Sequence, residues 1–210
     1  MHNRAFITIG LAALPLYAVL LVVGTLTPQP DQVTDPEGWA RFVSTDSYLI
    51  KHTATNVLGP VLVVLGTFAL GAALKQRAAV VGMALSVTGQ MLFMVPGVIS
   101  TFATPPIGKA YLRGNRDVMT MEFADAMTVI TLLAVLLAVA GSVVLGVAVA
   151  RSGVFARWTG ILWAAAAVIF YLLGAALGMA TTGASLATQP VGAGLMAAAS
   201  GAMAWQAARS

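Results

Sequence analysis

Cysteine is absent from all 210 residues, and charged residues are scarce. Without cysteine the chain forms no disulfide of its own and offers no thiolate to zinc or to an iron–sulfur cluster. Asp, Glu, Lys and Arg make up 9% of the chain, whereas roughly 25% is usual in a soluble domain. Because 59% of the residues are hydrophobic and the mean hydropathy is +0.90, the composition excludes an ordinary soluble domain and predicts a polytopic membrane protein.

Signatures of catalysis and of nucleic-acid binding are also lacking. The chain has only two histidines, His2 and His52, and contains neither an HExxH nor a GxSxG motif. The net charge is +4, but the eleven Lys and Arg are spread singly between apolar runs, so we expect no nucleic-acid partner. No pattern predicts a cofactor or assigns a catalytic residue, and this weighs against an enzyme.

Long uncharged runs are what the chain does contain. The run from Ala126 to Ala150 would extend about 37 Å as a helix, enough to cross a hydrocarbon core of about 30 Å. The first run, Ala5 to Leu26, is longer than the apolar part of a signal peptide, so we expect a retained helix. We therefore predict an all-α bundle of six transmembrane helices in a single integral membrane domain, 1–210, with helices at about 5–26, 47–74, 78–102, 122–150, 158–180 and 191–208.

The first loop carries the signal of a short additional helix. Asp35, Pro36 and Glu37 are an N-cap, a proline at the first helical position and an early acid. Trp39, Phe42 and Val43 then fall on one side of the helix. Because tryptophan favours the membrane–water boundary, we expect an interfacial helix in this outer loop, with an ordinary packed loop as the alternative.

The charges predict how the chain is threaded. With the N-terminus in the cytoplasm, the inner segments hold six basic residues and no acid, and the outer segments hold five basic residues and all seven acids. The inner loops are short, which is where an excess of Lys and Arg marks the cytoplasmic side. We expect a multi-pass protein of the cell membrane with both termini cytoplasmic and these inner basic residues: Arg4, Lys75, Arg77, Arg151, Arg157 and Arg209.

Two further patterns concern helix packing. Residues 47–102 and 122–180 resemble each other around their basic turns, which favours a two-helix repeat; chance alignment of small residues is the alternative. Small residues at four-residue spacing let helices approach closely. These small residues predict a tight bundle and faces for a homo-oligomer or for other transmembrane subunits. The residues are Ala138, Ser142, Gly146 and Ala150, then Gly174 and Gly178, then Gly194, Ala198 and Ala202.

Polar residues concentrate in the outer half of the predicted bundle, where Pro60 and Pro96 also interrupt two helices. We predict that they converge on an outward-facing pocket that binds a membrane lipid or another apolar small molecule, formed by His52, Asn56, Gln90, Glu122, Asp125 and Thr128. One imidazole and two carboxylates from His52, Glu122 and Asp125 could hold Zn²⁺ or Fe²⁺. Without ligand spacing of a known kind, we read them as headgroup-facing side chains and predict no metal site.

One stretch carries a resemblance. The run from Arg151 to Leu162 contains Arg157, Trp158 and Gly160 after a short basic loop. It resembles uncharacterised small multi-pass bacterial membrane proteins in which Arg-Trp-x-Gly opens a helix, and the segment from Asp35 to Gly66 is similar to another part of them. The resemblance implies a helical bundle and no activity.

Three functions are compatible with these patterns. The first is a non-catalytic binding or accessory subunit with the outward-facing pocket. The second is a small transporter for a neutral solute. The third is a lipid-modifying enzyme of the outer interface that uses His52, Glu122 and Asp125 as acid, base or ligand. Because catalytic motifs and charges at mid-membrane depth are both lacking, the sequence favours them in this order.

Overall fold

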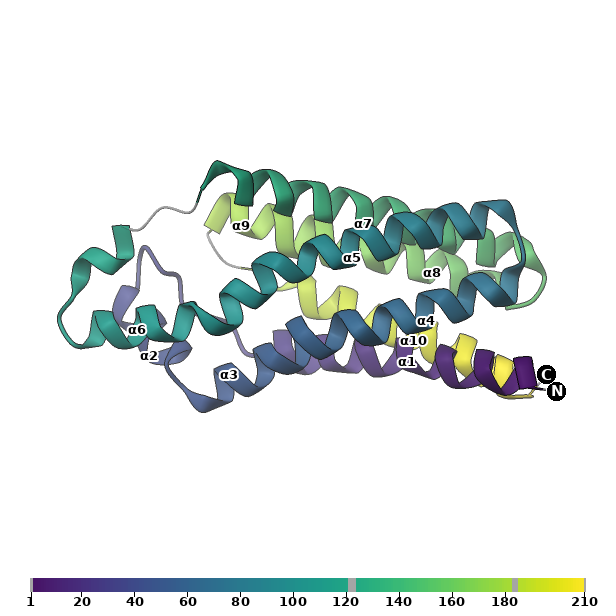
Figure 1. Cartoon of the computed structure of the whole chain (residues 1–210), viewed down its shortest axis with the longest axis horizontal. Helices are drawn as coiled ribbons and strands as arrows, with labels where there is room; N and C mark the ends of the chain where they lie inside the picture. Colours follow the sequence, from purple (N-terminus) through teal and green to yellow (C-terminus); the bar gives the residue numbers. More distant parts are fainter. Residues whose placement is uncertain (1, 121–123, 183–184, 210) are drawn as a thin grey trace.

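In the computed structural model, which describes residues 2–120, 124–182 and 185–209, helices and their connections account for the whole described chain, with no strand among these residues. The long helices lie side by side in a bundle (Figure 1). In chain order the elements are α1 (His2–Thr25), α2 (Pro36–Val43), α3 (Asp46–Thr53), the π-helical η1 (Ala54–Leu58), α4 (Gly59–Leu74), α5 (Arg77–Phe102), α6 (Thr104–Leu112), the 3₁₀ turn η2 (Arg116–Thr120), α7 (Asp125–Ser152), α8 (Arg157–Ala167), the π-helical η3 (Val168–Ala176), α9 (Leu177–Thr182) and α10 (Thr188–Arg209).

In the part of the chain that the structure describes, five helical segments are long and apolar enough to cross a membrane, which is the pattern of a membrane protein. The sixth predicted helix forms as α10, with 22 residues, but it is not among these five. Its sequence is rich in Gly, Ala and Ser, whose low hydropathy weakens the membrane signal. The candidate spans are Ala5–Thr25, Asp46–Leu74, Arg77–Leu112, Asp125–Ser152 and Arg157–Ala176.

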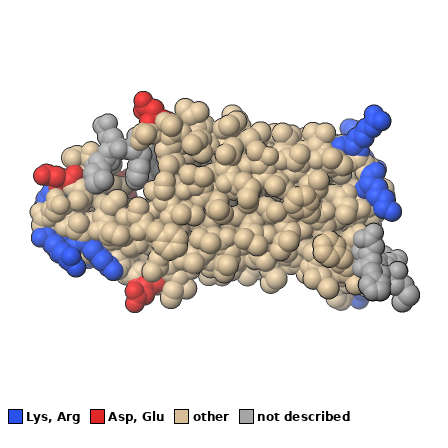
Figure 2. Space-filling model, viewed as in Figure 1, with Lys and Arg blue, Asp and Glu red and all other residues tan. Residues whose placement is uncertain are grey.

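Charge divides the molecule into a band and two ends. Lys and Arg lie at both ends of the visible face, Asp and Glu gather at one end, and the wide band between them is uncharged on this face (Figure 2). Both chain termini lie at the end that holds the α4–α5 and α7–α8 turns (Figure 1). We call this the basic end, and we call the end that holds α2, α6 and η2 the acidic end.

The predicted helix bounds agree with the observed ones within three residues, but two local features differ. The second helix contains η1 just before Pro60, and the Gly59 amide donates to the Ala54 carbonyl, five residues back. A proline has no amide hydrogen for the carbonyl four residues before it, so the turn widens there. Between the predicted helices 78–102 and 122–150, the chain forms a further helix, α6, which ends at Leu112. Because proline is tolerated in a first helical turn, Pro105 and Pro106 open α6 as well as ending α5.

Small residues bring the long helices into backbone contact. On α7, Ala138, Ser142 and Gly146 are buried, as the spacing predicted. On α10, Gly194 and Ala198 are exposed and do not pack inside the bundle, so their role as a face for another subunit stays a prediction. The buried face of α10 is instead Gly192, Ala193, Met196, Ala199, Ser200 and Met203.

The predicted helix in the first loop is present as α2. The Asp35 carboxylate caps it by accepting from the Gly38 amide at 2.9 Å. Trp39 and Val43, expected to face the membrane boundary, are buried in a cluster with Tyr48 and Tyr111. The alternative of an ordinary packed loop is therefore right about the packing and wrong about the loop, because the segment is a helix. The position of α2 relative to a membrane surface stays a prediction.

Candidate functional site

The acidic end carries a small folded layer that we call the outer cap, residues 28–43 and 104–120. Its core is a cluster separate from the main core of the bundle, centred on Trp39, Val43 and Tyr111. Gly108 lets α6 approach α2 closely, since a Cβ there would lie 2.6 Å from a Val43 methyl group. The cluster fixes α2 against α6 and so sets the shape of the surface between them.

A cavity of about 370 Å³ opens in the outer cap, and we call it the outer cleft. This volume is within the usual range for small-molecule sites, about 300–1,000 Å³. The Gln32 amide donates to the Met119 sulfur at 3.9 Å, and Val33 is 85% exposed. The lining is amphipathic, with one amide, one hydroxyl, one thioether and aliphatic groups, from Gln32, Val33, Pro36, Tyr111 and Met119.

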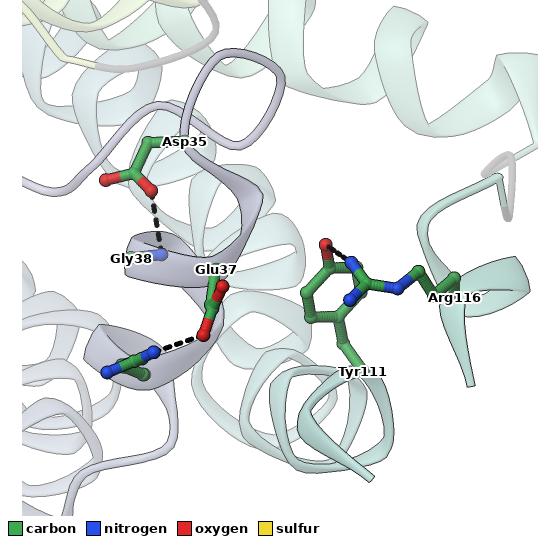
Figure 3. A network of polar contacts seen from close by, with 6 residues as sticks. Asp35, Glu37, Gly38, Tyr111 and Arg116 are labelled. Atoms are coloured by element: carbon green, nitrogen blue, oxygen red, sulfur yellow. Dashed lines mark hydrogen bonds and ion pairs between the residues drawn. The ribbon is translucent and has the colours of Figure 1, made fainter. Parts of the chain in front are cut away.

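Polar contacts hold the walls of the outer cleft in place. The Arg116 guanidinium donates to the Tyr111 hydroxyl and lies over the same ring, 4.8 Å from its centroid (Figure 3). On the other wall, the backbone amides of Thr34 and Val33 donate to the Asp31 carboxylate at 2.8 and 2.7 Å and hold the pKa of that carboxyl below its usual value. A turn closed in this way presents Gln32 and Val33 in one conformation.

Two of the predicted site residues, His52 and Asn56, lie together below the outer cap. The His52 ring stacks on Tyr48 at 3.7 Å between centroids, and its Nδ1 is 3.1 Å from the Tyr48 carbonyl. The Asn56 amide nitrogen donates to the Gly97 carbonyl and to the Thr101 hydroxyl, both at 3.2 Å. Both side chains are half-buried. Asn56 joins η1 to the outer half of α5, whereas these contacts of His52 lie within α3.

Gln90, by contrast, belongs to a deeper network. Its amide nitrogen donates to the Tyr171 hydroxyl at 2.6 Å, and this hydroxyl is 2.5 Å from that of Tyr17. None of the three side chains is more than 3% exposed. We call them the polar triad; they connect α5, η3 and α1. Sequence reasoning missed the two tyrosines, although a hydroxyl in a long apolar run is a signal, because a buried tyrosine usually finds a partner.

The remaining predicted residues are distributed differently. Asp125 and Thr128 are exposed at the start of α7, and Glu122 lies outside the described residues. Among the residues that the structure describes, no group of three or more His, Cys, Asp and Glu side chains could hold a metal ion. The structure therefore brings His52 and Asn56 together, gives Gln90 other partners, and leaves the shared pocket with Glu122 a prediction.

Comparison of the chain with models of known protein families, with curated proteins and with solved structures gave no match. A function must therefore be argued from the chain's own surfaces. The outer cleft is open and amphipathic, whereas the polar triad is enclosed. Of these two features, only the outer cleft combines free volume with polar groups, so it is the better candidate for a binding site.

Proposed function

We propose that this chain is a non-catalytic membrane protein that binds a lipid or another apolar small molecule at its outer side, as a receptor or accessory subunit. The outer cleft carries the proposal. It offers about 370 Å³ with Gln32 and Tyr111 as orienting polar groups and Val33, Pro36 and Met119 as apolar walls. A molecule with an apolar body and one polar group matches this lining, because apolar walls provide affinity and a few fixed polar groups provide orientation.

The position of the outer cleft also supports a lipid-like ligand. The outer cap follows directly on the outer halves of α3 and α5, where the uncharged band ends (Figures 1 and 2). Lys51 lies at this level and donates from its ammonium group to the Thr27 hydroxyl at 3.1 Å. A molecule dissolved in the outer leaflet would reach the outer cleft along the bundle surface without crossing bulk water.

The absence of native cysteine makes this proposal directly testable. A Val33→Cys variant labelled with the fluorophore bimane reports from the edge of the outer cleft, and Asn115→Cys reports from the outer cap outside it. On titration with oleoyl-lysophosphatidylcholine in nanodiscs, we expect a saturable blue shift at position 33 and none at 115. Adding Gln32→Ala should weaken the response about tenfold, the effect of one lost hydrogen bond to a charged group.

Gln29→Ala is the matched control, since it removes the same amide from the same loop at a residue that does not line the outer cleft. It should leave the titration unchanged. An equal shift at positions 33 and 115, or a response that never saturates, would mean that the probe partitions into the membrane without occupying a site.

We further propose six membrane crossings, with α10 as the sixth and both termini on the cytoplasmic side of the cell membrane. Two observations support this. Both chain ends lie at the basic end (Figure 1), which requires an even number of crossings. All the charged residues that the structure describes in the α4–α5 and α7–α8 turns are basic: Lys75, Arg77, Arg151 and Arg157.

Single cysteines at exposed positions test this threading. An impermeant maleimide added to intact cells should label Asn115→Cys in the outer cap and Ala187→Cys just before α10. It should label Val154→Cys and Ala208→Cys only after permeabilisation. The pair 187 and 208 flanks most of α10. If both positions of this pair label from the same side, α10 does not cross and the count is five.

Transport of a neutral solute is the second candidate, and the polar triad favours it. Tyr171 lies in η3, and π-helical turns inside membrane helices are frequent at functional sites. The ring of Tyr17 also packs beside Gly59, immediately after η1. Glycerol flux through proteoliposomes that disappears in Gln90→Leu would favour transport over simple binding.

A further inference from the structure

A second cavity lies at the basic end, opposite the outer cleft. It has a volume of about 210 Å³ and is formed where the start of α1, the end of α4, the α7–α8 connection and the end of α10 meet. We call it the basic-end pocket. Its lining includes Thr8, Leu11, Lys75, Phe155 and Gln206. Thr8 and Gln206 supply polar groups from α1 and α10, and Lys75 supplies one from the α4–α5 turn, whereas Leu11 and Phe155 are buried apolar walls.

The polar groups of this pocket are donors for an anion. Lys75 carries an ammonium group and is in no ion pair within the described part of the chain. The Gln206 side-chain oxygen accepts from the Ala156 amide at 2.8 Å, and its amide nitrogen carries two donor hydrogens. Thr8 adds a hydroxyl. Ammonium, amide and hydroxyl donors around one small volume are the chemistry that recognises a phosphate group.

The backbone at Lys75 supports a role for its side chain. Its φ of 52° is left-handed, and Lys75 is the only non-glycine residue with a positive φ among those that the structure describes. Glycine or asparagine adopts this conformation at the end of a helix with less strain. A lysine at this position places a charge at the rim of the pocket at some cost in backbone energy.

The depth of the pocket relative to a membrane is marked by two tryptophans. Trp158 and Trp205 are 52% and 60% exposed, and the Arg209 guanidinium carbon lies 4.1 Å from the Trp205 ring centroid. Exposed tryptophans beside arginines are typical of the headgroup level of a bilayer. Gln206 follows Trp205 directly in the chain, so the pocket lies at this level.

We propose that the basic-end pocket is a specific site for one anionic phospholipid, whose headgroup phosphate is bound by Lys75, Thr8 and Gln206 while its acyl chains run along the apolar surface of α1. Charge complementarity supports this occupant over a zwitterionic lipid. No acid lies in the predicted segments at this end, and the visible face shows only Lys and Arg there (Figure 2). Basic pockets between transmembrane helices are a known way to bind anionic headgroups.

The test uses the full chain and native mass spectrometry after reconstitution with equal amounts of phosphatidylglycerol and phosphatidylcholine. We expect the wild type to retain one phosphatidylglycerol in preference to phosphatidylcholine. Lys75→Asn removes the charge and tolerates the left-handed backbone, and it should reduce phosphatidylglycerol occupancy at least about tenfold. Thr8→Val should reduce it a few-fold. Lys75→Gly also removes the charge and relaxes the backbone, so it should lose as much phosphatidylglycerol as Lys75→Asn. A difference between the two variants would show that one of them misfolds.

Arg77→Gln is the matched control, because it removes one positive charge two residues away, outside the pocket lining. It should keep the wild-type preference. A loss in Arg77→Gln equal to that in Lys75→Asn would show a diffuse charge effect and overturn the site. Lack of any lipid preference in the wild type would overturn it too, as would binding of inorganic phosphate without a lipid adduct. None of these results bears on the outer cleft, which lies at the other end of the molecule.

Discussion

Replacing Gly141 by leucine is expected to destabilise the protein by at least about 3 kcal/mol, the upper part of the range for overpacked cores. A Cβ at Gly141 would lie 2.2 Å from the backbone nitrogen of Ser86, and a Cβ at Gly89 would lie 2.3 Å from that of Ala138. These atoms belong to the facing backbones of α5 and α7, so no side-chain rotation can relieve the clash. The two helices would have to move apart along their common length, and the contacts of the polar triad with α5 would be lost with them.

The matched control for this prediction is Gly194→Ala on α10, where a Cβ would meet nothing within 4 Å. It should be neutral or slightly stabilising, because alanine favours a helix by roughly 1 kcal/mol over glycine. The measurement is the unfolding free energy in mild detergent, with Gly141→Ala as an intermediate step. If Gly141→Leu and Gly194→Ala have equal stability, the close approach of α5 and α7 is not a determinant of the fold.

Tyr171→Phe is expected to cost about 2 kcal/mol, near the upper limit for hydrogen bonds inside membrane proteins. The Tyr171 hydroxyl contacts both the Gln90 amide and the Tyr17 hydroxyl, so its removal leaves two buried polar groups without that partner. Tyr111→Phe is the same substitution in the outer cap, where the hydroxyl contacts the exposed Arg116. There the partner can turn to water, and we expect a loss below about 1 kcal/mol.

A mutant cycle shows whether the stability lost in Tyr171→Phe comes from unpartnered polar groups or from packing. Replacing all three members of the triad, as Tyr17→Phe, Gln90→Leu and Tyr171→Phe together, removes the unpartnered groups as well as the hydrogen bonds. Because an apolar replacement of every partner is close to neutral, the triple variant should be more stable than Tyr171→Phe alone. A triple variant that loses the sum of the three single effects would mean that the residues act through packing and not through the shared hydroxyl.

The packing of the outer cap explains why the outer cleft could not be predicted from the sequence. Its cluster joins Trp39 and Val43 to Tyr111, far along the chain, and the prolines after Thr104 suggest a stop rather than a new helix. The outer cleft exists only because these two segments pack together. His52 and Asn56 could be placed on one helix face by spacing alone, but the partners of Asn56 on α5 depend on how that helix is rotated.

The sequence by itself determined that the chain is helical, that several of its helices are apolar enough to cross a membrane, and about where the long helices begin and end. The reason is that a backbone in hydrocarbon must satisfy its hydrogen bonds within each segment, so run length and local caps are sufficient. Only the tertiary structure decided which polar groups meet. Tyr17 and Tyr171 are 154 residues apart, and their contact depends on the relative rotation and depth of α1 and η3, which no local pattern encodes.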